Sequence, residues 1–205
     1  MKITSSLLML LLIAALASAQ RNKRISIAFL NTGTAYPFAQ FSQLATHMQH
    51  PGVEAGYSFN LRAKSKHDWY QEYKLAYFYH RYVQHAILLY TDIGYRYKIS
   101  HGLTAQLALG AGYLQAIPAT AKLKLQANGE YKNGKGLGRM QGMATANIGV
   151  GYTVYPPRKP PVTIFTTYQQ LLQMPFVKAY VPILPYNSLL IGFGIPLQSN
   201  KKIKS

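Results

Sequence analysis

The feature of the sequence that most constrains its fold is an alternation of apolar residues with small or polar ones at a period of two. It recurs in six segments, residues 52–60, 72–80, 86–98, 103–113, 143–154 and 188–197. Successive side chains of a β-strand point to opposite faces, so this period predicts strands, and the many Gly and Tyr residues argue against helices. Two weaker segments, residues 25–34 and 162–173, bring the expected number of strands to eight.

The composition of the two strand faces decides which of them is buried. One face carries Leu, Ile, Val and Tyr, and the other carries Gly, Ala, Ser, Thr, Asn and Gln with a few ions. Only 13% of all residues are charged, about half the share of a soluble domain. The small polar face fits the confined interior of a barrel, and the apolar face fits lipid, with Tyr near the strand ends at the headgroups. We therefore predict an all-β fold, a single eight-stranded antiparallel up-and-down transmembrane β-barrel, in residues 20–198.

The first 19 residues have the three parts of a secretory signal peptide. Met1 and Lys2 give a positive start, residues 7–16 form an uncharged apolar run, and residues 17–19 (Ala-Ser-Ala) are the small residues that signal peptidase requires. The apolar run is shorter than the ~20 residues that span a bilayer. We expect cleavage near Ala19, export, and a location in the cell outer membrane. Residues 199–205 are expected to form a basic tail after the barrel.

The connections between the predicted strands alternate in length. Short ones are expected at residues 64–69, 100–102 and 155–161, and long ones at residues 35–51, 117–139 and 174–187. Outer-membrane barrels have short periplasmic turns and longer extracellular loops. The alternation therefore supports eight strands that begin on the periplasmic side, with one exception, a short outer turn near Arg81.

The chain resembles the small eight-stranded outer-membrane β-barrel proteins of Gram-negative bacteria. The signal peptide, the alternating strands and the closing segment Leu189–Leu197 carry this resemblance. Two segments, His50–Gly56 and Gln173–Lys178, are similar to uncharacterised barrels of the Bacteroidota. The resemblance implies assembly by the barrel-insertion machinery, although such barrels often end on an aromatic residue and this chain continues to Ser205.

Six ionisable residues share the parity of the predicted inward face: Glu54, Glu72, Lys74, His80, Asp92 and Arg96. We place the remaining carboxylates elsewhere, Asp68 in a turn and Glu130 in a loop. One interpretation of the six is a proton-transfer or ion-binding site, because confined carboxylates beside cations have perturbed acidities. The other, which we favour, is a structural plug, because eight-stranded barrels fill their lumen with side chains and charges inside must pair.

Some small barrels that resemble this chain in size hydrolyse acyl chains of lipid A with a Ser, a His and an acid near the outer rim. A nucleophilic Ser needs a His base within hydrogen-bond reach, and on one strand face the two would be spaced by two residues. The sequence contains no His-x-Ser. Ser100 and His101 adjoin in a predicted periplasmic turn, and His85 has the lipid-facing parity without a Ser nearby.

No catalytic, cofactor-binding or metal-binding residue is predicted. The absence of Cys excludes disulfides, thiolate zinc sites and a cysteine nucleophile. His47 and His50 could share a metal only if their segment were helical, and a loop beside Pro51 is the simpler interpretation. Residues 134–139 have the glycine-rich composition of a phosphate-binding loop, but such a loop needs a helix after it, and here a strand is expected.

The 22 Lys and Arg residues give the chain a net charge of +17. Many lie in the predicted connections: Lys64, Lys66, Lys122, Lys124, Lys132, Lys135, Arg139, Arg158 and Lys159. Cations at both ends of the strands can bind the phosphates of lipopolysaccharide and phospholipid. Nucleic-acid binding would instead cluster them on one face, so we expect lipid and not nucleic acid as the partner.

The sequence therefore predicts a non-enzymatic outer-membrane barrel whose surface loops contact lipopolysaccharide or a protein partner. The first alternative is a lipid A-modifying acyl hydrolase, which a Ser, a His and an acid meeting at one rim would identify. The second is a secreted lipocalin-like carrier of an apolar ligand, whose apolar strand faces would point inward. An eight-stranded lumen is too narrow for general diffusion.

Overall fold

The computed structural model describes residues 22–197 except residues 38, 40, 48, 121–122, 126–128, 134–135, 158–159 and 177–179. The predicted signal peptide with its cleavage position at Ala19 and the basic tail lie outside the described residues, as do Lys122, Lys135, Arg158 and Lys159. The described elements are β1 (Lys23–Gly33), α2 (Phe41–Thr46), β2 (His50–Ala63), β3 (His67–His80), β4 (Gln84–Ser100), β5 (Leu103–Pro118), β6 (Leu123–Leu125), β7 (Tyr131–Asn133), β8 (Arg139–Val154), β9 (Val162–Met174) and β10 (Leu184–Leu197).

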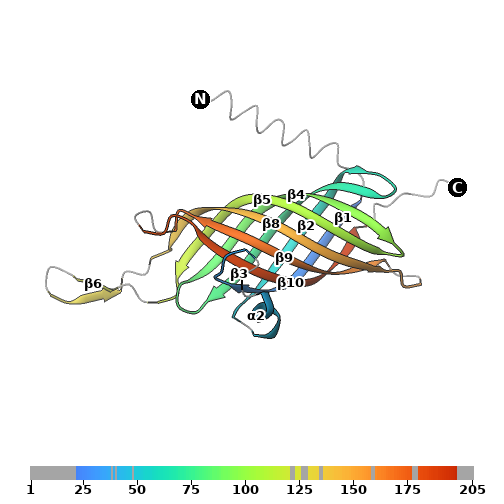
Figure 1. The fold of residues 1–205 in the computed structure, drawn as a ribbon. Helices are drawn as coiled ribbons and strands as arrows, with labels where there is room; N and C mark the ends of the chain where they lie inside the picture. Colours follow the sequence, from blue (N-terminus) through green and yellow to red (C-terminus); the bar gives the residue numbers. More distant parts are fainter. Residues whose placement is uncertain are drawn as a thin grey trace, which may run out of the picture.

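Eight of these strands form a closed antiparallel barrel in the order β1-β10-β9-β8-β5-β4-β3-β2 (Figure 1). β1 closes the ring by pairing with both β2 and β10, and its register with β10 runs from Lys23 opposite Leu197 to Gly33 opposite Asn187. Each of the eight strands therefore has two neighbours, and closure leaves no open sheet edge. The predicted eight-stranded antiparallel barrel is confirmed.

The first and last barrel strands start and finish at the same end of the barrel, which we call the terminal end. Three short connections lie there, residues 64–66, 101–102 and 155–161. The opposite end, the loop end, carries residues 34–49 with α2, residues 81–83, residues 119–138 with the β6–β7 hairpin, and residues 175–183. This alternation agrees with the prediction, including the short turn near Arg81. The helix α2 and the hairpin, which projects beyond the barrel in Figure 1, are features that the alternation pattern did not predict.

Most strands extend past the predicted segments by up to five residues, as β3 does from residue 72 back to His67 and β5 from residue 113 on to Pro118. β1 begins two positions before Ile25, and β9 ends one position after Gln173. Because β3 begins at His67, Asp68 lies in this strand and not in a turn, so its assignment to a turn was wrong. Asp68 is 4% exposed and its Oδ1 lies 2.9 Å from Lys98 Nζ of β4. The ion pair with β4 explains how β3 can include a charged residue so close to its first residue, His67.

Side chains on the barrel alternate as predicted, with the large apolar ones pointing outward. On β5, Leu107 and Leu109 are 56% and 71% exposed, while Ala108 between them is 6% exposed. On β8, Ile148 is exposed and the neighbouring Asn147 is buried. A soluble barrel has the opposite polarity, because its apolar face forms the core.

The barrel interior is less uniformly polar than predicted. Towards the loop end it is filled by an apolar core that includes Leu30, Phe78, Leu88, Leu114, Met143, Leu171, Tyr186 and Leu190. The rings of Phe78 and Tyr186 meet edge to face with their centroids 5.4 Å apart. The inside of an eight-stranded barrel is just wide enough to be filled by side chains, so large inward residues pack against one another there.

Among the described residues, no helix is both long and apolar enough to cross a membrane.

Candidate functional site

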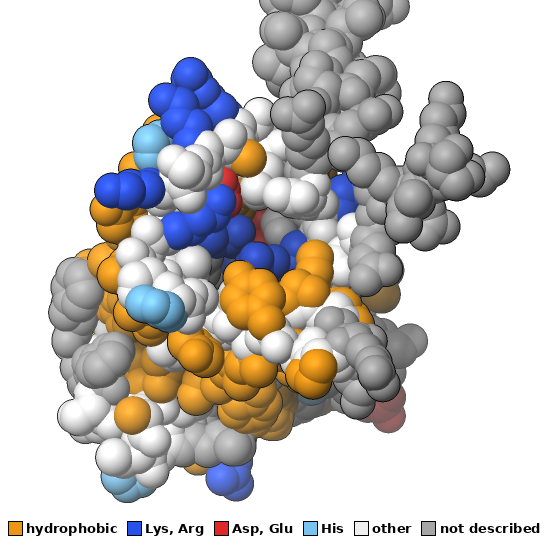
Figure 2. Space-filling model, turned by 90° about the vertical axis from the view of Figure 1, so that its right-hand side faces the viewer, with side chains coloured by type: hydrophobic (Ala, Val, Ile, Leu, Met, Phe, Trp, Pro, Cys, Tyr) orange, Lys and Arg blue, Asp and Glu red, His pale blue; other side chains and the backbone are white. Residues whose placement is uncertain are grey.

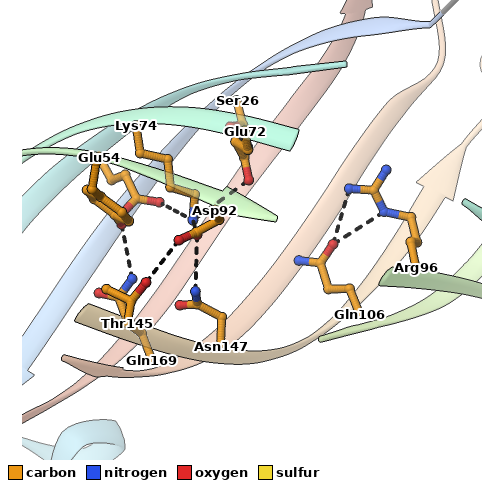
Figure 3. A network of polar contacts seen from close by, with 11 residues as sticks. Ser26, Glu54, Glu72, Lys74, Asp92, Arg96, Gln106, Thr145, Asn147 and Gln169 are labelled. Carbon is orange, nitrogen blue, oxygen red and sulfur yellow. Dashed lines mark hydrogen bonds and ion pairs between the residues drawn. The ribbon is translucent and has the colours of Figure 1, made fainter. Parts of the chain in front are cut away.

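Four of the six predicted lumen residues meet in one ion cluster, defined here as Glu54, Glu72, Lys74 and Asp92 (Figure 3). Lys74 Nζ lies 3.1 Å from both Glu54 Oε1 and Asp92 Oδ2. It lies 3.7 Å from Glu72 Oε2. The four side chains come from the adjacent strands β2, β3 and β4, and Glu72 pairs directly with Asp92 in the ladder. One cation from β3 is thus surrounded by carboxylates from three neighbouring strands.

Asp92 is bound from the far side by the strand β8. Thr145 Oγ1 donates to Asp92 Oδ1 at 2.9 Å, and Asn147 Nδ2 donates to Asp92 Oδ2 at 3.1 Å. Gly110, opposite Asp92 on β5, makes room for these contacts. A Cβ at this position would collide with Asp92 Oδ1 and come within 2.5 Å of Thr145 Oγ1.

The other two carboxylates also have neutral donors. The Tyr90 hydroxyl donates to Glu54 Oε2, and Gln169 Nε2 donates to the Tyr90 oxygen at 3.0 Å. Ser26 Oγ donates to Glu72 Oε1 at 3.1 Å. These donors come from β1, β4 and β9, so the ion cluster ties together strands on opposite sides of the barrel. The sequence places these donors on the inward face of their strands. Which donor contacts which carboxylate depends on how far neighbouring strands are shifted along one another in the barrel.

The ion cluster leaves little space for a substrate. The cavity beside it, lined by Glu54, Glu72 and Lys74 among others, measures about 30 Å³, the volume of roughly one water molecule in the liquid. Asp92 is 1% exposed and Lys74 is 8% exposed. Each carboxylate contacts Lys74 and at least one neutral donor, and little space remains beside them, which favours a structural plug over an ion-binding or proton-transfer site.

The remaining two predicted lumen residues lie apart from the ion cluster. Arg96 is nearer the terminal end, where its Nε and Nη2 donate to Gln106 Oε1 at 3.3 and 3.2 Å (Figure 3). Its guanidinium carbon lies 4.4 Å from the centroid of the Tyr70 ring. His80 is at the loop end, where its ring stacks on His50 at a centroid distance of 3.6 Å.

The residues considered for an acyl hydrolase do not meet an acid. His85 Nδ1 lies 2.9 Å from the Tyr77 hydroxyl on the outer surface of the barrel. Ser100 Oγ lies 2.9 Å from His101 Nδ1, but this exposed pair is at the terminal end. Among the described residues, no carboxylate contacts either pair, and Asp68 of the terminal end is bound to Lys98.

The considered metal and phosphate motifs also lack the required secondary structure. α2 ends at Thr46, so His47 follows the helix and His50 lies in β2. No group of three or more described His, Asp or Glu residues could hold a metal ion. Gly136 and Gly138, with φ values of 53° and 85°, lead into strand β8 and not into a helix.

At the loop end, two buried asparagines fasten the first long connection to the barrel. Asn31 Nδ2 donates to the carbonyl oxygens of Leu44 and His47 at 2.8 and 2.7 Å. Its Oδ1 accepts the backbone N–H of Gln49 at 2.9 Å. Asn187 Nδ2 donates to the carbonyl oxygens of Tyr36 and Ala39 at 2.7 and 2.8 Å. Residues 34–49 are therefore held against the barrel at both their ends and their centre.

A glutamine network fills the lumen between the apolar core and the loop end. Gln84 Nε2 donates to Gln173 Oε1 at 2.8 Å and to the Tyr186 hydroxyl at 3.2 Å. Gln173 Nε2 donates to Gln141 Oε1, and Gln141 Nε2 donates to the carbonyl of Pro175 at 2.6 Å. The network joins β4, β8, β9 and β10 and fastens the connection 175–183. Neither it nor the two asparagines was singled out from the sequence, where Asn and Gln at strand ends resemble ordinary polar positions.

The loop end also presents exposed aromatic side chains. Four tyrosines from four connections are exposed there: Tyr36, Tyr82, Tyr131 and Tyr180. The Arg81 guanidinium carbon lies 5.4 Å from the centroid of the Tyr82 ring. Tyr and Arg are enriched in recognition surfaces, so this end has the chemistry of a binding face.

No protein-family model matches the chain, and no curated protein matches it. Among solved structures, it is similar to Ail, the attachment invasion locus protein of Yersinia pestis, at 11% identity and a TM-score of 0.45, over 86% of this chain and 98% of that chain. It is similar to Neisserial surface protein A at 10% identity and a TM-score of 0.47, over 87% and 96% of the chains. It is similar to the outer membrane enzyme PagL at 11% identity and a TM-score of 0.46, over 85% of this chain and 99% of that chain. Likeness at this level concerns the fold alone, and the similarity to Bacteroidota barrels stays a prediction.

Proposed function

We propose that the protein is a non-enzymatic, integral β-barrel of the outer membrane, whose loop end contacts lipopolysaccharide or a protein partner. The observation that carries the proposal is the outer apolar face, to which every barrel strand contributes an exposed aliphatic residue: Ile27, Val53, Leu75, Leu89, Leu109, Ile148, Ile164 and Ile191. In water such a surface would be strongly unfavourable, at about 25 cal/mol per Å² of apolar area. In a bilayer it is the surface that lipid requires.

The polarity of the barrel argues against a lipocalin-like carrier. A soluble carrier needs an apolar cavity inside and a polar surface outside. Here the interior is filled by the ion cluster, the glutamine network and the apolar core, and the aliphatic residues point outward. The filled lumen also argues against a diffusion pore, so the function resides in the surfaces at the two ends.

The rim of the loop end has the charge that lipopolysaccharide requires. Arg81 and Arg139 are exposed there, at the turn between β3 and β4 and at the start of β8. Outer-membrane barrels carry their longer loops outside the cell, so these arginines would lie beside lipid A phosphates. Guanidinium groups bind phosphate through paired, charge-assisted hydrogen bonds. The exposed tyrosines beside them would contact sugar rings or a protein partner.

The membrane part of the proposal is tested by the electrophoretic mobility of the membrane-fraction protein, boiled against unboiled. We expect a shift on boiling, because closed outer-membrane barrels stay folded in detergent, together with resistance to alkaline extraction. A protein that is found soluble in the periplasm or medium would overturn the proposal.

The loop-end part is tested by binding of purified lipopolysaccharide to the folded protein. We expect Arg81→Gln and Arg139→Gln together to weaken binding, while Lys66→Gln at the terminal end leaves it unchanged. Equal affinities for all three proteins would remove lipopolysaccharide as the ligand of this face. The exposed tyrosines would then be tested against protein partners.

A further inference from the structure

The terminal end contains a pocket of about 320 Å³, which we call the terminal-end pocket. Four cationic residues line it, Lys23, Arg24, Arg96 and Lys98, against a single carboxylate, Asp68. Figure 2, which looks at this end of the molecule, shows Lys and Arg side chains gathered around a hollow. Hydroxyl and amide groups complete the wall, among them those of Ser58, Asn60, Thr104, Thr153 and Thr163.

Arg24 has no ionic partner in this pocket. It belongs to the inward face of β1, two residues before Ser26, and is half-buried. Its guanidinium group makes no hydrogen bond and no salt bridge to another described residue, although its backbone is paired in the sheet. The two carboxylates on its side of the lumen already have partners. Glu72 is bound by Ser26 and Lys74. Asp68 is bound by Lys98.

Arg96 is more deeply buried and is also not neutralised. It is 8% exposed, and its hydrogen bonds go to Gln106, an uncharged amide. Its Nη1 has no hydrogen-bond partner among the described residues. Arg24 and Arg96 line the same pocket and their positive charges repel each other. Glu72 and Asp68 attract Arg24 from a distance, but neither forms an ion pair with either arginine. The pocket wall keeps an excess of positive charge, four cations against one carboxylate, which would favour a bound anion.

The terminal-end pocket is blind. Arg24 and Arg96 also line the cavity of about 30 Å³ that lies deeper in the barrel. Beyond that cavity the lumen is closed by the ion cluster and the apolar core. A ligand would therefore enter and leave through the terminal end, and the pocket serves binding and not passage.

We propose that the terminal-end pocket binds a small soluble phosphate dianion, either inorganic phosphate or a phosphomonoester. Arginine presents its donors in a planar fork that matches phosphate oxygens. Arg24 and Arg96, with the exposed Lys23 in the same pocket wall, match a doubly charged group. The pocket volume is at the lower end of the range for small-molecule sites, which suits such a ligand. In the orientation proposed above, the pocket opens to the periplasm.

The test is calorimetric titration of the purified, folded barrel in an uncharged detergent at low salt, with inorganic phosphate and with glycerol 3-phosphate. We expect saturable binding that weakens about tenfold or more in Arg24→Gln and in Arg96→Gln, the loss typical of a charged hydrogen bond. Arg62→Gln is the matched control, because Arg62 is an exposed arginine of the same end that does not line the pocket. Its affinity should equal that of the unchanged protein.

Three results would overturn the proposal: no saturable phosphate binding, an affinity unchanged in Arg24→Gln, or an equal loss in the Arg62→Gln control. Arg24 is the decisive position if Arg96→Gln does not fold, because its side chain is the less buried of the two. The boiled and unboiled mobilities confirm that each variant is folded. Glycerophosphoglycerol, a soluble phosphodiester with the headgroup chemistry of phosphatidylglycerol, distinguishes the source of the phosphate. We expect it to bind more weakly, and binding as tight as that of phosphate would assign the pocket to lipid headgroups instead.

Discussion

The Lys74 ammonium group lies 3.1 Å from a carboxylate oxygen of Asp92, whose side chain is 1% exposed. The same ammonium lies 3.1 Å from Glu54 and 3.7 Å from Glu72. One cation therefore stabilises three carboxylates in an interior with almost no space for water. Its removal would leave several negative charges confined together.

Lys74→Met should destabilise the barrel by about 3–5 kcal/mol, the usual cost of breaking a buried ion pair on one side. Unfolding by denaturant in detergent, followed by the mobility shift between folded and unfolded forms, measures this difference. Lys66→Met is the matched control, because Lys66 is exposed in the turn between β2 and β3. Its effect should stay within about 0.5 kcal/mol. Similar stabilities of the two variants would show that the ion cluster is not structural.

Gly110→Ala should also destabilise the ion cluster. The added methyl group would collide with Asp92 Oδ1 and with the Thr91 carbonyl of the neighbouring strand. Overpacking of this kind costs about 1–3 kcal/mol, and it should lower the temperature at which the unboiled band disappears. In Gly142→Ala the nearest atom to the new Cβ is 3.4 Å away, so this control should unfold at an unchanged temperature. The structural account of Asp92 would be wrong if both glycines tolerated Ala equally.

The fold was predictable because period two is a local property of each strand. Residues such as Leu109 and Ala108 reveal their faces by parity alone. The low charge of the second face favoured a membrane barrel, and the outward position of the large apolar residues then argued against the soluble alternative. The hairpin formed by β6 and β7 was not predictable in this way, because its strands have only three residues each. Asp68 falls in the predicted connection 64–69 because the alternation is recognisable only from residue 72, whereas β3 begins at His67 and Lys98 of the next strand pairs with Asp68.

For the candidate site, the sequence predicted the strand face on which each residue lies, but not its depth in the barrel or its partners. Parity placed Lys74 and Arg96 on the same side of β3 and β4, but the two differ in depth along the barrel and join different networks. Depth and cross-barrel partners depend on how far neighbouring strands are staggered. The sequence does not specify that stagger locally. For the same reason Thr145 and Asn147 could not be assigned to Asp92 in advance.

A charge in the middle of the outer apolar face should prevent stable insertion. Leu109 lies near the centre of β5 and is 71% exposed, so Leu109→Arg would place a cation in lipid at a cost of about 2–4 kcal/mol. We expect a reduced folded fraction in bilayer refolding assays, measured by the unboiled band. Leu137→Arg, at a more exposed position outside the barrel strands, should fold like the unchanged protein. A barrel that stood in water would accept both changes, and full folding of Leu109→Arg would contradict the membrane assignment.

Asn31→Ala should release the first long connection without unfolding the barrel. The side chain of Asn31 holds the backbone of Leu44, His47 and Gln49, and loss of these bonds leaves polar groups unsatisfied at about 1–3 kcal/mol. Residues 34–49 contain no Lys or Arg but do contain aromatic residues, so chymotrypsin is the suitable protease. We expect faster cleavage in this segment while the unboiled mobility is retained. Asn60→Ala, at the terminal end, is the matched control and should be cleaved there at the original rate. Equal cleavage of the two variants would mean that the connection is held by contacts other than those of Asn31.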